Sequence, residues 1–401
     1  MILNLGILLL VLVVCEIFLQ IIIKYFRRDF QWLITEKDSN PFFDKIALKK
    51  FINNSFDKEL GWVRKPNTTG VEVGANSKIV YHIDSNGSRE NLVGSKVTIA
   101  SFGDSYTFGR QVEDFQTWQV RLSEKLGEKV LNYGVGNYGA DQAFLYYQRQ
   151  KIPKTTKIVI LGIVPETICR IHSYWKHYLE FGNTFAFKPR YTLDHGQLTL
   201  HKSPIEGLED FDDFEKVLGV LKKYDDFYEI KFKKLQFRFP YLKSYFLNFK
   251  RNSMLLYSLS KRKVFHFLGV ENKKVENDPF NRIMIDNIKH SHEMYQNKQA
   301  CKLLELILIK FCDMARDRGH TPLLLIMPQL IDLKIINEVG HTPYEDFFFE
   351  MSKKESVIDT TLDLNKENSK IFYTEDLYGG HFSELGNQLV ADKVFDYLSE
   401  S

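Results

Sequence analysis

One segment of the chain places a serine where a nucleophile could be held. Residues 97–102 form a short apolar run of the kind found in buried strands, and residues 117–126 show the apolar spacing of a helix. Gly103, Asp104 and Ser105 follow the strand directly. A serine in such a loop can attack an ester carbonyl if a base removes its proton. The same tripeptide also suits a plain turn that caps a helix, so the loop alone does not establish catalysis.

A segment near the C-terminus could supply the base. His381 lies in residues 375–387, which also contain Glu375 and Asp376. A serine nucleophile needs an imidazole to accept its proton and a carboxylate to hold that imidazole in the right tautomer. Both residue types occur on this one loop, in the chain order serine, acid, histidine. A structural histidine beside the cap of the final helix is the alternative interpretation.

A third loop could stabilise negative charge on the substrate oxygen. Residues 132–142 begin with three glycines and two asparagines among eight residues, and these residue types let backbone N–H groups turn outward. Outward N–H groups are what an oxyanion hole requires. A tight strand-to-helix turn would have the same composition.

The elements around these loops predict the fold. Residues 129–132, 157–161 and 322–327 are further buried strands by pattern, and residues 303–318 form an amphipathic helix closed by Gly319. Buried strands that alternate with helices pair in parallel and are covered on both faces. We therefore predict the α/β class, a three-layer α/β/α sandwich with a central parallel sheet. Ligands of such sheets bind outside the carboxyl ends of the strands, where the three loops lie.

The alternation of strands and helices predicts the domain boundaries. Residues 25–95 are polar and rich in turns, and we expect this lead-in to pack on a main domain of residues 96–401. At about 181–289 the alternation stops, and phenylalanine, tyrosine and lysine become frequent. A structureless loop of that length is improbable in a compact domain, so we predict a helical insertion that forms a lid or subdomain.

Residues 1–24 are predicted to be a single transmembrane anchor. The run 2–23 is almost continuously aliphatic and reaches the roughly 20 residues that span a bilayer. A cleaved signal peptide is the alternative, but no basic residue precedes the run and no small-residue cleavage site follows it. Glu16 is costly in hydrocarbon unless it is paired or protonated. Three basic residues that follow would hold the main domain in the cytoplasm by the positive-inside tendency: Lys24, Arg27 and Arg28.

Charge and cysteine content exclude several classes of partner. The 54 basic and 51 acidic side chains are interspersed and give a net charge of only +3, so we expect no nucleic-acid partner. The four cysteines form neither a CxxC pair nor a spacing with histidine typical of zinc sites, and we expect no metal and no cofactor. Arg170, His172 and His177 follow the third strand, and we interpret them as a solvated helix face rather than as part of a pocket.

Taken together, the three loops resemble the motifs of the SGNH/GDSL hydrolase superfamily. The resemblance runs from about residue 96 to the C-terminus, apart from the insertion. Gly103-Asp104-Ser105 matches the first motif and His381 the last. The resemblance implies the flavodoxin-like fold of that superfamily, with Ser105 as nucleophile and His381 as general base.

The chain departs from the family pattern at the acid and at the oxyanion hole. The family places its aspartate three residues before the histidine, where this chain has Tyr378. We predict Asp376 as the acid of the triad and keep Glu375 as the alternative. The asparagine of the third family motif is missing after Gly162. The predicted oxyanion donors are therefore Ser105, Gly136, Asn137 and Thr167.

The function predicted from these residues is ester hydrolysis by a Ser-His-Asp acyl-enzyme mechanism. The resemblance implies an acylated glycan, a lipid or a small ester as substrate. A glycan O-acetyltransferase with the same triad is one alternative, because a sugar hydroxyl can replace water. A membrane-tethered binding protein with weak activity is another, since one customary oxyanion donor is missing. The anchor predicts a membrane location, but the basic flank and the resemblance to envelope esterases point to opposite sides.

Overall fold

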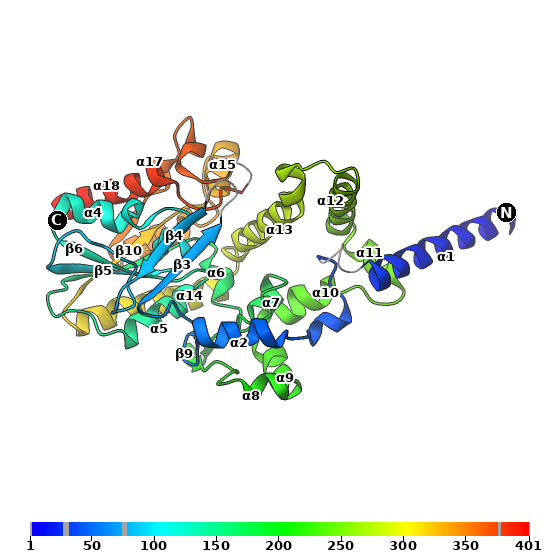
Figure 1. The fold of residues 1–401 in the computed structure, drawn as a ribbon, viewed down its shortest axis with the longest axis horizontal. Helices are drawn as coiled ribbons and strands as arrows, with labels where there is room; N and C mark the ends of the chain where they lie inside the picture. The colour runs from blue at the N-terminus through cyan, green and yellow to red at the C-terminus, as the bar shows by residue number, and fades with distance from the viewer. Residues whose placement is uncertain (1, 27–31, 74–77, 376–377, 401) are drawn as a thin grey trace.

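Five parallel strands form the central sheet of the molecule (Figure 1). The structure, a computed structural model, describes residues 2–26, 32–73, 78–375 and 378–400. Across the sheet the strand order is β11-β10-β7-β5-β6, so the first strand of the sheet in the chain lies between the second and the third. This is the flavodoxin-like order. In it, ligands bind at the switch point between the first and the third strand of the sheet, here β5 and β7. The strands are β5 (Val97–Gly103), β6 (Lys129–Gly134), β7 (Ile158–Ile163), β10 (Thr321–Ile326) and β11 (Val357–Asp359).

Helices cover both faces of this sheet, which confirms the predicted three-layer α/β/α sandwich (Figure 1). Apolar side chains alternate along the strands: Phe102 of β5 packs in the core on one face, and Ile99 in the core on the other. Because the four longer strands are buried on both faces, their sequences are mainly apolar. The helices of the first face are α5 (Ala140–Arg149) and α14 (Lys298–Asp317), and those of the second are α4 (Trp118–Leu126) and α18 (Glu384–Glu400).

The strand register brings the predicted loops to one edge. Gly103 at the end of β5 pairs with Gly134 at the end of β6, and Phe102 pairs with Leu161 of β7. The loops after these three strands therefore begin side by side. The remaining short elements around the sheet are α3 (Ser105–Phe108), η2 (Asp114–Gln116), α6 (Thr167–Arg170), α7 (Lys176–Leu179), α15 (Leu330–Val339), α16 (Glu345–Ser352), α17 (Thr361–Leu364) and η4 (Ser369–Phe372).

The residues before the sheet support the serine loop. The guanidinium of Arg89, which is 1% exposed, donates hydrogen bonds to the carbonyls of Phe108, Gly109 and Val112. These bonds fix the backbone just beyond α3. The elements of this region are η1 (Glu36–Ser39), α2 (Lys45–Asn54), β1 (Phe56–Asp57), β2 (Gly61–Trp62) and the antiparallel pair β3 (Thr68–Val73) and β4 (Lys78–Ile83).

The stretch 181–289, predicted as a helical insertion, is mainly helical and also contains an antiparallel hairpin. Its last helix extends to Met294 and reaches the carboxyl edge of the sheet, and just after it the hydroxyl of Tyr295 donates to the carbonyl of Pro165 at 2.7 Å. The elements are β8 (Arg190–Asp194), β9 (Gln197–His201), α8 (Glu209–Asp212), α9 (Phe214–Tyr224), the π-helical turn η3 (Tyr228–Phe232), α10 (Lys233–Leu235), α11 (Tyr241–Leu247), α12 (Phe249–Phe267) and α13 (Lys273–Met294).

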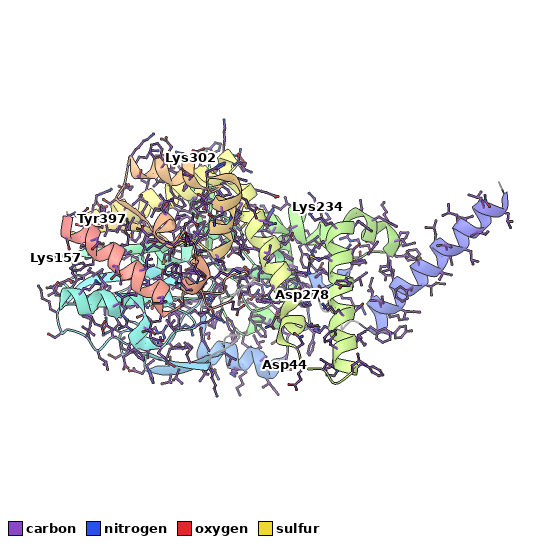
Figure 2. All side chains as sticks on the ribbon, turned by 90° about the horizontal axis from the view of Figure 1, so that it is seen from above. Asp44, Lys157, Lys234, Asp278, Lys302 and Tyr397 are labelled. Carbon is purple, nitrogen blue, oxygen red and sulfur yellow. The ribbon has the colours of Figure 1, made fainter. Side chains whose placement is uncertain are left out.

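The N-terminal helix α1 (Ile2–Tyr25) extends away from the rest of the molecule in both views (Figures 1 and 2). Within it, Leu3–Tyr25 is long and apolar enough to cross a membrane, a property that an anchor shares with a signal sequence. Most of its side chains are exposed, whereas Leu19, Ile22 and Ile23 are buried against other elements.

Candidate active site

Two of the predicted residues, Ser105 and His381, are in direct contact. The hydroxyl oxygen Oγ of Ser105 lies 2.9 Å from Nε2 of His381. Asp104 caps the short helix α3, since its Oδ1 accepts the N–H of Tyr106 at 2.9 Å. Only glycine fits at 103, because a Cβ there would lie 2.0 Å from the hydroxyl of Thr107. The tight turn after β5 therefore presents Ser105 to the histidine.

Hydrogen bonds fix the loop that carries His381. Its backbone N–H donates to Oγ1 of Thr374 at 3.1 Å, and its carbonyl accepts the N–H of the same residue at 2.9 Å. The hydroxyl of Tyr106 donates to the carbonyl of Gly380 at 3.0 Å. Gly380 adopts the left-handed region with φ of 62°, which a residue with a Cβ adopts rarely. The serine and histidine loops are thus joined beside the side chains of Ser105 and His381.

The second ring nitrogen of His381 faces a side chain that the sequence analysis did not single out. Nδ1 lies 2.9 Å from Oε1 of Gln111, and the same oxygen accepts the hydroxyl of Thr374 at 2.7 Å. An oxygen acceptor at Nδ1 keeps the proton there, so Nε2 is left free to accept the proton of Ser105. Gln111 is itself in the left-handed region, with φ of 71°, between backbone carbonyls held by Arg89.

The structure describes one of the two candidate acids of the triad, Glu375. Asp376 lies outside the described residues. The backbone N–H of Glu375 donates to the carbonyl of Gly379 at 3.2 Å, so this residue helps to close the loop before His381. Gln111 is thus the partner that the described structure gives to Nδ1 of His381.

The electrostatic environment keeps the imidazole neutral. Burial lowers the pKa of His381 well below its usual value of 6.5, and the positive charges of Arg110 and Arg170 lower it further. A protonated imidazole cannot accept the serine proton. The lowered pKa therefore favours the neutral imidazole, the form that can accept a proton.

A buried ionic cluster lies directly behind the serine. Arg170 donates to Oδ2 of Asp104 at 2.6 Å, to Oε2 of Glu166 at 2.8 Å and to the carbonyl of Tyr138 at 3.1 Å. The three charged side chains are at most 7% exposed. Burial raises the pKa of Asp104, although Arg170 opposes this shift. The interpretation of Arg170 and His177 as a solvated helix face was wrong, since both are buried.

The predicted oxyanion donors surround the same edge of the sheet. No described residue accepts a hydrogen bond from the backbone N–H of Ser105, Gly136 or Asn137. Asn137 has φ of 69°, and the loop is pinned by the indole of Trp62, which donates to the carbonyl of Gly136 at 3.0 Å. Oγ1 of Thr167 accepts the N–H of Ala140 at 2.8 Å, which leaves its hydroxyl proton available for donation.

A polar groove of about 830 Å³ begins at this loop. Glu72 lies in its wall and binds both Arg64, at 2.7 Å, and Arg110, at 2.9 Å. Two further lysines line it, so the groove is positively charged: Lys50 and Lys65.

The described residues bring one set of potential metal ligands together, away from the three loops. Ligand atoms of His82, Glu90 and Asp114 lie within 4.8 Å of one another. The carboxylate of Asp114 is already held by Arg89 at 2.6 Å and by His82 at 2.7 Å. We therefore interpret this group as an ion-pair cluster.

Comparison with known proteins gives distant structural matches. No protein-family model matches the chain, and no curated protein matches it. A solved structure from Desulfitobacterium hafniense DCB-2, named as a lipolytic protein of the G-D-S-L family, is 11% identical with a TM-score of 0.32; the match covers 75% of this chain and 99% of that one. A second solved structure is 12% identical with a TM-score of 0.32, covering 78% and 99%. At these TM-scores the matches carry no argument about the family or the activity of this chain, so the resemblance to GDSL hydrolases rests on the residues and geometry described above.

The lowered pKa of His381 predicts activity that persists on the acid side of the usual histidine range. The acid limb of kcat/KM for p-nitrophenyl acetate should lie below about pH 6.5. Replacing Arg110→Gln removes a positive charge that disfavours protonation, so the pKa of His381 should rise and the acid limb should move to higher pH. Arg64→Gln, which removes the other partner of Glu72, is the matched control. Equal profiles for both variants would contradict this electrostatic account.

Proposed function

We propose that this protein is a membrane-anchored serine ester hydrolase. The observation that carries the proposal is the 2.9 Å contact between Oγ of Ser105 and Nε2 of His381, with Nδ1 bonded to an oxygen on the other side of the ring. This is the arrangement by which an imidazole activates a serine. It lies at the carboxyl edge of a parallel sheet, where ligands of this architecture bind.

The proposed reaction forms and breaks one acyl-enzyme. Oγ of Ser105 attacks the ester carbonyl carbon while Nε2 of His381 takes the hydroxyl proton. The imidazolium, still donating from Nδ1, then gives this proton to the departing alcohol oxygen. Water attacks the acyl-enzyme with its proton again passing to Nε2, and Ser105 is restored as the carboxylic acid leaves. We propose Asp376 as the carboxylate that stabilises the imidazolium, with Gln111 holding its orientation.

The negative oxygen of the tetrahedral intermediate needs donors that are already in place. We propose the backbone N–H groups of Ser105 and of Gly136 or Asn137 for this role, supported by their lack of described acceptors. The hydroxyl of Thr167 is the third proposed donor. Each such donor is commonly worth about 100- to 1000-fold in rate. An oxyanion hole made of backbone N–H groups and one hydroxyl should support slower hydrolysis than an oxyanion hole that also contains a side-chain amide.

The groove beside this site supports a polar substrate. Its basic residues surround a single ion-paired carboxylate, which favours an ester carried on an anionic or hydroxyl-rich molecule over a long apolar chain. Of the predicted substrates, an acylated glycan fits this wall better than a lipid acyl chain does. The same groove has room for an acceptor, so acyl transfer to a sugar hydroxyl is the second candidate reaction.

The contacts of α1 support its retention as an anchor. The carboxylate of Glu16 accepts the backbone N–H groups of Tyr241 and Leu242 at 2.6 and 2.8 Å, which supplies the partner that this carboxylate requires in a membrane. Removal of α1 as a signal sequence would leave those N–H groups and the apolar contacts of Ile22 and Ile23 without their partners.

A fluorophosphonate probe tests the nucleophile. The probe should label the wild-type protein and should not label Ser105→Ala, because the activated hydroxyl is lost. Ser383→Ala is the matched control, since Ser383 lies on the histidine loop with its hydroxyl bonded to the carbonyl of Ile371. Absence of labelling in wild type would overturn the hydrolase proposal and favour a binding protein.

Two variants separate the roles proposed for Gln111 and Asp376. A hydrogen bond to a charged group contributes about 1.5–3 kcal/mol, so Gln111→Leu should lower kcat roughly 10- to 100-fold with little change in KM. Loss of a carboxylate bonded to Nδ1 costs about 10⁴-fold in kcat; because Gln111 takes that position here, Asp376→Asn should lower kcat by less than this. Gln111→Glu should retain activity because it keeps an acceptor at Nδ1. An unchanged kcat in either loss variant would remove that residue from the mechanism.

Acetate release distinguishes hydrolysis from transfer. If water is the acceptor, release of acetate from an acetylated glycan should proceed at the same rate with and without added sugar. If a sugar hydroxyl is the acceptor, adding the sugar should yield acetylated product at the expense of free acetate. The second result would contradict hydrolysis and identify an O-acetyltransferase that uses the same Ser105.

A further inference from the structure

A second element lies beside the proposed anchor. Residues 239–270, here called the basic arm, contain α11 and α12, and both pack near the C-terminal part of α1 (Figure 1). In the core that joins them, Ile22 and Ile23 of α1 pack with Leu255 and Leu259 of α12. Lys263 of α12 also lies over the ring of Phe26, just beyond α1. The basic arm therefore meets any membrane that α1 enters.

The contact with Glu16 shows how far along α1 the basic arm reaches. Glu16 precedes Tyr25 by nine residues, which corresponds to about 14 Å along a helix. At that level its carboxylate accepts the first N–H groups of α11, from Tyr241 and Leu242. Helix N-termini leave such groups unpaired, and in water they bind solvent. Mutual pairing of a carboxylate with these N–H groups is the arrangement required where water is excluded.

The basic arm presents large apolar side chains to its surroundings. Four side chains around α11 are between 55% and 73% exposed, although they are aromatic or aliphatic. They lie on the segment that adjoins α1, which is itself covered with exposed aliphatic side chains. The two apolar surfaces are therefore continuous. These four side chains are Phe239, Phe246, Leu247 and Phe249.

The charge of the basic arm identifies the kind of surface that it fits. Residues 239–270 contain six lysines or arginines and no aspartate or glutamate, whereas the whole chain has a net charge of only +3. Among the exposed members are Lys243, Lys250 and Lys261. Aromatic residues interleaved with lysine and arginine are typical of helices that lie in a bilayer interface, with rings among the acyl chains and cations at anionic headgroups.

We propose that the basic arm is a second membrane-binding element, which lies in the interface of a bilayer with anionic headgroups beside α1. The inference rests on the proposed function in one respect, that α1 is a membrane anchor. It adds that α11 and α12 contact lipid themselves. The reacting edge of the sheet is thereby held near the membrane by two elements, and α13 continues from the basic arm to that edge.

Lipid quenching of a fluorophore on the full-length protein tests this proposal. Cysteines are introduced one at a time as Phe246→Cys on the basic arm and Leu385→Cys on α18, in a Cys15→Ser and Cys301→Ser background, and are labelled with NBD. Native Cys15, exposed on α1, is labelled in a separate sample as the reporter of the anchor. Each protein is reconstituted into vesicles of phosphatidylcholine and phosphatidylglycerol with and without doxyl-labelled lipid.

Quenching at positions 15 and 246 with none at 385 is expected. Quenching at 15 without quenching at 246 overturns the basic arm as a lipid-binding element, including the case in which a protein partner covers it. No quenching at 15 overturns the anchor in the proposed function, and the inference falls with it. The two failures are thus distinguishable.

The charge requirement is tested in the same vesicles. Replacing Lys243, Lys250 and Lys261 together by glutamine should lower the quenching at 246 at least twofold, with quenching at 15 unchanged. Vesicles of phosphatidylcholine alone should give the same reduction for the unsubstituted protein. The matched control replaces three exposed lysines outside the basic arm, Lys151, Lys154 and Lys310, and should leave quenching at 246 unaffected. Equal quenching in neutral and anionic vesicles would overturn the requirement for anionic lipid.

Discussion

The guanidinium of Arg170 connects the loops on which the site depends. It binds Asp104 after β5, the carbonyl of Tyr138 after β6 and Glu166 after β7. Parallel strands bring these loops to one edge, but the sheet does not fix their mutual positions. A buried cation that binds all three does, because its loss would leave two buried carboxylates unpaired, at a cost of about 3–5 kcal/mol. The placement of Ser105 follows directly, since Asp104 is its neighbour and caps its helix.

Much of the architecture could be predicted from the sequence because it depends on local patterns. The continuous apolar runs gave four of the five strands, and their alternation with helices gave the parallel sheet. Ser105 and His381 were predicted because a glycine-rich turn and a C-terminal loop with acidic neighbours are visible in the chain. The strand β11 is only three residues long and carries no such pattern. The hairpin of β8 and β9 was missed for a similar reason, because its exposed residues do not form an apolar run.

What could not be predicted depends on contacts between distant residues. Gln111 and His381 are 270 positions apart. Gln111 also has a left-handed backbone conformation, which a glutamine in the sequence does not predict. Glu16 looked unfavourable in an apolar helix because its partners, at 241 and 242, lie in the insertion. Arg170 looked like a surface residue because one of its two acidic partners, Asp104, lies 66 positions away and meets it only in the folded chain. In each case the signal is a polar residue whose burial the local sequence does not explain.

The long helix α13 joins the basic arm to the loop that carries His381. It packs against α12 at one end, and its Phe280 contacts the ring of Tyr378 with centroids 5.9 Å apart, three residues before His381. Pro279 lies within α13, one residue before Phe280, and removes one backbone hydrogen bond of the helix at that point. The loop that carries His381 thus contacts α13 through Tyr378. Phe280 is seven residues from the start of α13, which is about 11 Å along the helix, so the loop that carries His381 lies close to the end of the basic arm.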